Sequence, residues 1–336
     1  MSSTGARALH ALRTQSTSSA RGSVWGRSPT AVGLGLGAVA DLVLADPRRG
    51  HPVAGFGQAA AALESRTWRD STAAGVAYTA VCVGTATALG AALSGLTARR
   101  PLARTALTAA ATWAVLGGTS LGRAATTMEQ HLAAGDLAAA RTHLPTLAGR
   151  DPSGLDEPAL VRATVESVAE NTSDAAVAPL FWGAVAGLPG LLGYRAANTL
   201  DAMVGYRSAR YARFGWAAAR FDDVVNWVPA RVAAALTVLT APLAGGSAGG
   251  ARRAWQRDGA AHPSPNAGRC EAALAGALGL RLGGRNVYGE RVEERPTLGD
   301  GQPPVRGDIR RAVRLSRAVW TTAAALAAVG RLARRG

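Results

Sequence analysis

An uncharged stretch covers residues 71–98 and is bounded by Asp70 on one side and by Arg99 and Arg100 on the other. A helix of about 20 mostly apolar residues is long enough to cross the ~30 Å hydrocarbon layer of a membrane. A soluble helix of this length should present a polar face, and this stretch has none. The stretch therefore predicts a membrane-spanning helix.

Uncharged stretches recur along the rest of the chain. Two more are long enough to span a membrane, residues 175–194 and 232–251, and residues 105–122 are borderline. The outer two, residues 28–40 and 318–330, would need flanking arginines that extend to the lipid surface. We therefore expect an all-α polytopic membrane bundle with four to five transmembrane helices. Because Ala favours insertion only weakly, an Ala-rich soluble helical bundle remains the alternative.

The chain divides into a short tail and one large domain. Residues 1–29 are rich in Ser, Thr, Arg and Ala and contain no acidic residue, so we expect a disordered basic tail. Residues 30–336 are expected to form a single membrane-embedded domain. Its two polar regions, residues 123–162 and 252–317, predict surface helices and loops. No strand alternation is convincing, and residues 283–301 are expected to form a glycine-rich loop.

The net charge of +15 comes from arginine alone, since the chain contains no lysine. This excludes a Schiff-base lysine and the lysine of a P-loop. The arginines are scattered among apolar blocks, and aromatic residues make up only 5% of the chain, too few for nucleic-acid stacking platforms. We therefore expect no nucleic-acid partner. An anionic lipid surface or a phosphorylated substrate fits better.

An acidic stripe lies just before the stretch 175–194. Glu166, Glu170 and Asp174 are four residues apart, so on a helix they span only about 80°. Carboxylates gathered in this way are unfavourable unless a cation neutralises them. The stripe therefore predicts magnesium or phosphate chemistry at a membrane surface.

A second polar group follows that apolar stretch. Arg195, Asn198 and Asp201 are each three residues apart, and Tyr206 and Arg207 come within two further turns. Such a mixture can hold a metal-bridged phosphate, since Mg²⁺ takes one or two carboxylates together with phosphate oxygens while Arg binds the rest. A buried ion-pair network between helices is the structural alternative.

A third group contains the neighbouring carboxylates Asp222 and Asp223, with Asn226 on the same flank of a helix. Adjacent aspartates repel each other unless a cation or nearby arginines such as Arg231 neutralise them. This predicts a second acidic site. The alternative is an interfacial helix cap anchored by Trp227.

Two turn-rich segments add further candidates. In residues 41–58 an acid, two arginines and an imidazole share a loop stiffened by proline, with Asp46 and His51 as candidates for binding a phosphate or a carboxamide. A structural role for His51 stays open. In residues 262–271, Asn266 and Glu271 are the more suggestive residues.

The motifs DPRRGHPV, VESVAENTSDAAVAPLFWGAVAGLPG, YRAANTLDAMVGYRSARYARFGWAAARFDDVVNWVPARV and HPSPNAG…EAALAGALG together resemble the adenosylcobinamide-phosphate synthase family of cobalamin biosynthesis, CobD or CbiB. The resemblance covers roughly residues 41–300. It implies a mostly helical, multi-pass membrane protein. It also implies ATP- and Mg²⁺-dependent amide formation between adenosylcobyric acid and aminopropanol, usually as the O-phosphate.

On this interpretation each candidate group receives a role. Mg²⁺ would be held by the catalytic set Glu166, Glu170, Asp174 and Asp201, with Asp222 and Asp223 as a second acidic site. The substrates, including the corrinoid and the phosphates, would be bound by Asp46, His51, Asn171, Arg195, Asn198, Tyr206, Arg207, Asn226, Arg231, Asn266 and Glu271.

The resemblance also implies a location and partners. We expect a cell-membrane protein embedded in the lipid bilayer, with its active site on the cytoplasmic face where ATP is found. A homo-oligomer, or contact with other membrane proteins of the cobalamin pathway, is compatible with this expectation.

The alternative function is a corrinoid transporter or a non-catalytic corrinoid-binding scaffold. A transporter should show two related halves with broken helices, and the sequence shows no such symmetry.

Overall fold

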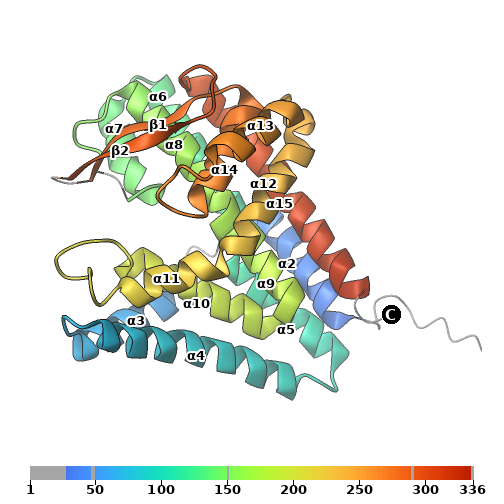
Figure 1. Ribbon diagram of the computed structural model, residues 1–336. Helices are drawn as coiled ribbons and strands as arrows, with labels where there is room; N and C mark the ends of the chain where they lie inside the picture. The colour runs from blue at the N-terminus through green and yellow to red at the C-terminus, as the bar shows by residue number, and fades with distance from the viewer. Residues whose placement is uncertain (1–27, 47–49, 150, 289–290, 334–336) are drawn as a thin grey trace, which may run out of the picture.

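The computed structural model describes residues 28–46, 50–149, 151–288 and 291–333 (Figure 1). The predicted tail, residues 1–29, therefore lies almost entirely outside the described residues. The described part is mostly helical. Its α-helices are α2 (Pro29–Leu44), α3 (Pro52–Thr67), α4 (Thr72–Leu96), α5 (Pro101–Val115), α6 (Gly118–Ala133), α7 (Leu137–His143), α8 (Glu157–Thr172), α9 (Ala178–Ala186), α10 (Leu188–Val204), α11 (Trp216–Val225), α12 (Trp227–Thr240), α13 (Ala248–Asp258), α14 (Ala267–Leu278) and α15 (Arg306–Ala333).

Short helical segments of other types join some of these helices. Their bounds are η1 (Leu144–Thr146, 3₁₀), η2 (Ser173–Val177, π) and η3 (Ala241–Ala244, 3₁₀). The π segment connects α8 directly to α9, and a single π turn inside a longer helix is often found at a functional site.

The main core forms around the long C-terminal helix α15, which packs against α2, α6, α8, α9 and α12 (Figure 1). The buried residues of α15 recur every three or four positions, as helical packing on one face requires. They include Ile309, Ala312, Leu315, Val319 and Ala323. Because α15 buries one face along most of its length, it begins in the polar region and continues as one helix through the apolar end of the chain.

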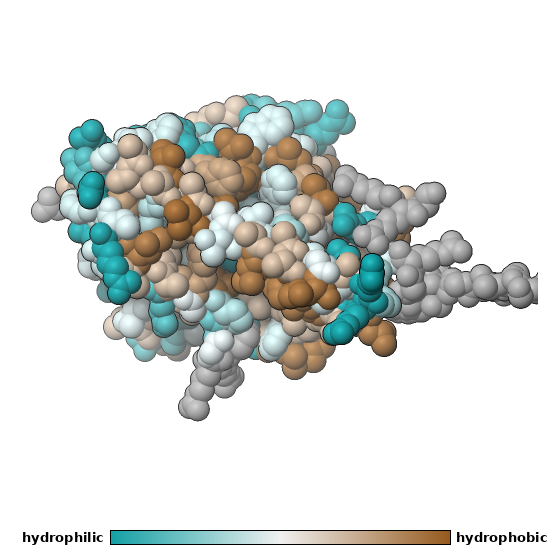
Figure 2. Space-filling model, turned by 90° about the horizontal axis from the view of Figure 1, so that it is seen from below, coloured by the Kyte–Doolittle hydropathy of each residue, from teal (hydrophilic) through white to brown (hydrophobic). Residues whose placement is uncertain are grey.

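A second, smaller core joins α3, α4, α10 and α11, which lie together at the lower side of Figure 1. Tyr78 of α4 packs against Phe214, and its hydroxyl donates to the Ala60 carbonyl of α3 over 3.2 Å. The outer side of α4 carries exposed Val76, Val81 and Leu89. Figure 2, which views the molecule from this lower side, shows apolar residues spread over the face.

Two helices of the described part are long and apolar enough to cross a membrane, Thr72–Leu96 and Trp227–Ala244. The expected four to five spans are therefore not confirmed. The predicted stretch 175–194 is divided between two helices at Gly187, whose φ of +67° favours glycine. The stretch 105–122 is likewise interrupted, because α5 ends at Val115 and α6 begins at Gly118.

The prediction of a glycine-rich loop without strands over residues 283–301 is wrong. Strands β1 (Leu282–Tyr288) and β2 (Arg291–Leu298) form an antiparallel hairpin. The polar sequence of β2 lacks the two-residue alternation that marks a strand, so pairing with β1 decides its structure. The register shifts at Gly283, whose φ of +87° suits an irregularity in the ladder. The Gly283 N–H donates to the Glu166 carboxylate over 2.9 Å, which docks the hairpin on α8.

Candidate functional site

A cavity of about 690 Å³ lies between α8, α10, α14 and β2. It brings together candidate residues from three separate stretches of the sequence. Its polar and charged lining consists of Glu166, Ser167, Glu170, Asn171, Asp174, Asn198, Asp201, Tyr206, Glu271 and Arg295. Five carboxylates thus share one wall with a single lining arginine, and we call this space the carboxylate cavity.

The acidic stripe forms because α8 begins and continues as a helix. The Asp156 side chain accepts from Ala159 N over 3.0 Å and caps the helix, and proline follows in the first turn, where its missing N–H costs nothing. Glu166 and Glu170 then face the cavity from α8. Asp174 belongs to the π turn η2 and still lines the same cavity. The sequence therefore predicted the stripe correctly but not the π turn.

The carboxyl groups around this cavity raise one another's pKa, because each negative charge makes ionisation of its neighbours less favourable. Burial, followed by repulsion from Asp223 and Glu170, raises the pKa of Asp201 to about 6. Burial and repulsion from Asp201 raise the pKa of Asp222 to about 7, although hydrogen bonds from Asn226 and Asn198 oppose the shift. Burial, followed by repulsion from Asp222 and Glu170, raises the pKa of Asp174 well above its usual value. Each carboxylate would be stabilised by a nearby cation.

The carboxylates of this cavity would suit Mg²⁺ only together with ligands from outside the protein. Among the described residues, no group of three or more His, Cys, Asp or Glu side chains is placed to hold a single metal ion. Mg²⁺, however, commonly uses only one or two protein carboxylates and completes its shell with phosphate oxygens and water. A pair of carboxylates such as Glu170 and Asp201, with Asp174 nearby, would suit an ion that arrives with a phosphorylated substrate. Glu166 already accepts from the hairpin backbone.

A second cavity of about 370 Å³ adjoins the carboxylate cavity, and Asn171 lines both. Asp46, His51 and Arg195 line this second space. His51 Nδ1 accepts from Val53 N over 3.2 Å, and its Nε2 lies 4.0 Å from Asp46. Residues Pro47, Arg48 and Arg49 of the predicted loop lie outside the described residues.

Arg195 connects the two cavities. Its Nη1 donates to Asn198 Oδ1 over 3.1 Å, and its Nη2 donates to the Val115 carbonyl. Burial lowers the pKa of Arg195 below its ordinary value. Protein carbonyl groups thus hold the guanidinium on one side. On its other side, the guanidinium orients the Asn198 amide, which lines the carboxylate cavity.

The predicted second acidic site is a hydrogen-bonded chain. Asp222 is buried, and its carboxylate accepts from Asn226 Nδ2 over 2.9 Å. Asp223 pairs with Arg220 over 3.2 Å. Neither aspartate lines the carboxylate cavity, so this pair is a separate group that acts on Asp201 and Asp174 electrostatically.

Three other predicted residues line neither cavity. Arg207 is exposed in the loop between α10 and α11. Arg231 donates to the Trp227 carbonyl over 2.7 Å, and its guanidinium lies 3.9 Å from the centre of that indole ring. Asn266 donates to the Asp223 carbonyl over 2.8 Å.

Arg295 was not among the predicted site residues, yet it is the arginine that lines the carboxylate cavity. Its Nη1 lies 3.0 Å from His262 Nε2, and that nitrogen lies 3.9 Å from Glu271. The His262 and Glu271 side chains are almost completely buried. The packing of the hairpin on α8, α13 and α14 brings Arg295 here, and no local signal in the sequence indicates that contact.

The fold and the cavities define a mainly helical protein with two helices apolar enough to cross a membrane and a carboxylate-lined pocket. The family model described as CobD/Cbib protein matches residues 34–316, and the chain belongs to this family of cobalamin biosynthesis proteins.

Curated relatives agree with this assignment. The chain is 57% identical to the cobalamin biosynthesis protein CobD of Mycobacterium tuberculosis H37Rv, over 88% of this chain and 94% of the relative. It is 44% identical to CobD of Geobacter metallireducens, over 80% and 88%, and 43% identical to CobD of Chromobacterium violaceum, over 88% and 95%. No solved structure matches the chain significantly.

Proposed function

We propose that this protein is an adenosylcobinamide-phosphate synthase, an ATP- and Mg²⁺-dependent amide-forming ligase. It would join the amine of (R)-1-amino-2-propanol O-phosphate, or of aminopropanol, to the propionate carboxylate of adenosylcobyric acid. The observation that carries the proposal is the convergence of five carboxylates, two amides and Arg295 on one cavity of a cobalamin biosynthesis protein.

The chemistry of amide formation agrees with these residues. A carboxylate oxygen attacks the γ-phosphorus of ATP and ADP leaves, which forms an acyl phosphate. The amine nitrogen then attacks the acyl carbon, inorganic phosphate leaves and the nitrogen loses a proton. Phosphoryl transfer depends on positioning and charge neutralisation rather than on a protein nucleophile. The chain has no lysine, and neither of its cysteines, Cys82 and Cys270, lines the carboxylate cavity.

Each part of the site would then have a task. Glu170 and Asp201 would hold Mg²⁺ with Asp174 as a nearby negative charge, and the ion would neutralise charge on the transferred phosphoryl group when bound. Asn171 and Asn198 would hydrogen-bond the corrinoid amides and orient the reacting carboxylate. Arg295 would bind a phosphate group.

We further propose that the protein is a multi-pass protein of the cell membrane with this site on the cytoplasmic side. The exposed apolar residues of α4 and the two helices Thr72–Leu96 and Trp227–Ala244 support membrane association. ATP is available on the cytoplasmic side, which is the reason for the proposed orientation.

The direct test uses detergent-solubilised protein supplied with adenosylcobyric acid, aminopropanol phosphate, ATP and Mg²⁺. We expect the amide product by mass spectrometry together with ADP. With ¹⁸O in the corrinoid carboxylate, the acyl-phosphate route transfers label to inorganic phosphate. Label in AMP would exclude that route. Corrinoid binding without any nucleotide turnover would instead support a transporter or a binding scaffold.

A further inference from the structure

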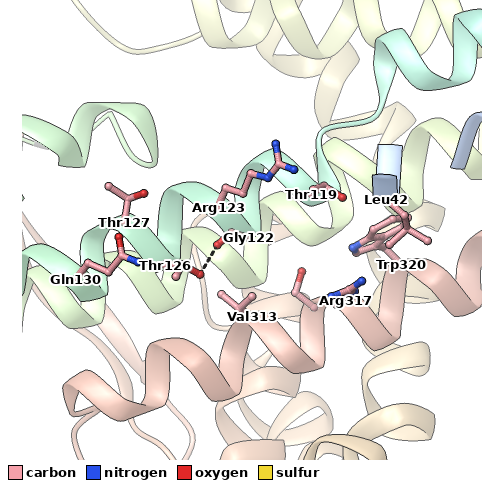
Figure 3. A pocket seen from close by; sticks show the side chains of 12 residues that line it. Leu42, Thr119, Gly122, Arg123, Thr126, Thr127, Gln130, Val313, Arg317 and Trp320 are labelled. Atoms are coloured by element: carbon pink, nitrogen blue, oxygen red, sulfur yellow. Dashed lines mark hydrogen bonds between the residues drawn. The ribbon is translucent and has the colours of Figure 1, made fainter. Parts of the chain in front are cut away.

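A third cavity, of about 540 Å³, lies between α6 and α15 (Figure 3). Over the part of the chain that the structure describes, it shares no lining residue with the carboxylate cavity or with the adjoining one, and no carboxylate lines it. None of the residues predicted from the sequence contributes to it. It is therefore a distinct space with a different electrostatic character.

Two arginines line this cavity from different helices. Arg123 comes from α6 and Arg317 from α15, as Figure 3 shows. Within the described part of the chain, neither guanidinium makes a hydrogen bond or a close ion pair. Arg123 lowers the pKa of the buried Asp41 carboxylate only as the smallest of several influences, and that carboxylate accepts from Thr119 N over 3.0 Å. Both arginines are thus available to an anion.

A buried hydrogen-bond donor completes the cavity. The Trp320 side chain is only 2% exposed, and Figure 3 shows its indole nitrogen on the cavity side of the ring. Among the described residues, no acceptor is bonded to this nitrogen. A Cβ added to Gly118 would lie only 2.8 Å from the indole, so the ring is packed closely against α6. The donor therefore has a fixed direction.

The remaining polar lining also suits an anion. Thr127 and Gln130 both line the cavity. Guanidinium groups bind phosphate through two parallel N–H bonds, which makes arginine the preferred partner of that group. Two arginines and an indole N–H around a space without carboxylates therefore match a phosphate group better than a metal ion or an apolar ligand.

An exposed apolar surface begins at the rim of this cavity. Leu42 of α2 lines it, and Leu36, Val39 and Val43 on the same helix are 49%, 54% and 69% exposed. A ligand with a phosphate in the cavity could lay an apolar portion along α2. We infer that the space between α6 and α15 is a phosphate-binding site, separate from the proposed active site, for a phospholipid headgroup or a soluble phosphate ester.

The test measures binding, so it does not depend on the proposed catalytic function. Purified full-length protein in neutral detergent is titrated with short-chain phosphatidylglycerol and, separately, with glycerol phosphate and inorganic phosphate. Arg317→Gln and Arg123→Gln should each weaken binding about tenfold, the loss expected for one charge-assisted hydrogen bond. Arg314→Gln is the matched control, because Arg314 is exposed on the same helix and does not line the cavity.

Trp320→Phe gives a second check, since it keeps the aromatic packing and removes the N–H. It should weaken binding several-fold, and because it also shortens a buried ring, the unfolding temperature is measured alongside to confirm that the variant is folded at the temperature of the titration. Binding of the lipid alone would assign the site to a membrane headgroup, and equal binding of glycerol phosphate would assign it to soluble esters. Absence of saturable binding by all three probes, or equal affinity of Arg317→Gln and Arg314→Gln, would overturn the inference.

Discussion

The Tyr194 hydroxyl donates to Asn226 Oδ1 over 2.9 Å, with the Asp174 carbonyl as a second acceptor at 3.0 Å, and so joins α10 to the junction between α11 and α12. Because Asn226 Oδ1 faces Tyr194, its Nδ2 faces Asp222, to which it donates over 2.9 Å. All three side chains are buried. One hydroxyl thus determines which end of an amide meets the second acidic site.

Tyr194→Phe removes this constraint and should destabilise the protein by about 1 kcal/mol, the usual net value of one hydrogen bond. Thermal unfolding in detergent measures the effect. Tyr206→Phe is a suitable control because Tyr206 is exposed. An unchanged unfolding temperature for Tyr194→Phe would show that the Asn226 amide keeps its orientation without the hydroxyl.

Stability should fall as the pH rises from about 4 to about 7. The folded pKa values of Asp201 and Asp222 are raised to about 6 and about 7, so the folded state holds protons that the unfolded state has already released. A full difference of one proton changes the free energy of unfolding by about 1.4 kcal/mol per pH unit. Unfolding curves across this range should show the slope, and Asp201→Asn with Asp222→Asn should flatten it. Mg²⁺ should stabilise the wild type more at pH 8 than at pH 5.

Glu170→Gln and Asp201→Asn should each lower the rate of amide formation at least about 100-fold while expression stays normal, because each removes a charge proposed to hold Mg²⁺. Product formation at limiting Mg²⁺ is the measurement. Glu157→Gln is the matched control, since Glu157 lies in the first turn of the same helix as Glu170 and outside the cavity. Near-normal turnover of both test variants would refute the magnesium assignment.

Gly205→Ala should impair turnover more than it impairs folding. A Cβ at this position would overlap the Asp201 carboxylate, with Cγ only 2.8 Å away. The carboxylate would have to turn away from its present position in the cavity. Steady-state kinetics and thermal unfolding together test this, with Gly55→Ala as control because nothing lies within 4 Å of its added Cβ. Equal activity of the two variants would mean that the position of Asp201 is not critical.

Arg295→Lys should raise the KM for ATP or for the phosphorylated amine about tenfold, since an ammonium group cannot reproduce the two-point contact of a guanidinium. The kcat should change much less. Arg281→Lys serves as control, because Arg281 is exposed just before β1. An unchanged KM for every anionic substrate would show that Arg295 does not bind an anionic group of the substrates.

Local spacing was sufficient to predict part of this site. The four-residue step from Glu166 to Glu170 fixes their common side of α8, and the three-residue step from Asn198 to Asp201 does the same on α10. These patterns depend on helix geometry alone, so they remain valid whatever the helices pack against.

Contacts between distant segments could not be predicted in this way. Arg295 reaches the cavity because the hairpin packs against α8, α13 and α14, for example through the bond from Gly283 to Glu166, two residues far apart in the sequence. The hydropathy pattern also failed to predict the break at Gly187, where one uncharged stretch becomes two helices. An average over the composition of a stretch does not depend on the φ angle of one residue. For Arg231 the structure shows a contact within its own helix, where the guanidinium lies over the Trp227 ring, and its predicted role in substrate binding stays a prediction.

The π turn at Ser173–Val177 has a consequence for how the gene can change. A π turn contains one residue more than an α turn and absorbs that residue locally, so a single deletion there would restore one continuous α-helix and leave the segments on either side facing as they do now. The same deletion inside α8 or α9 would rotate everything beyond it by about 100°. Loss of one residue should therefore be tolerated more readily within these five residues than in the helices that flank them.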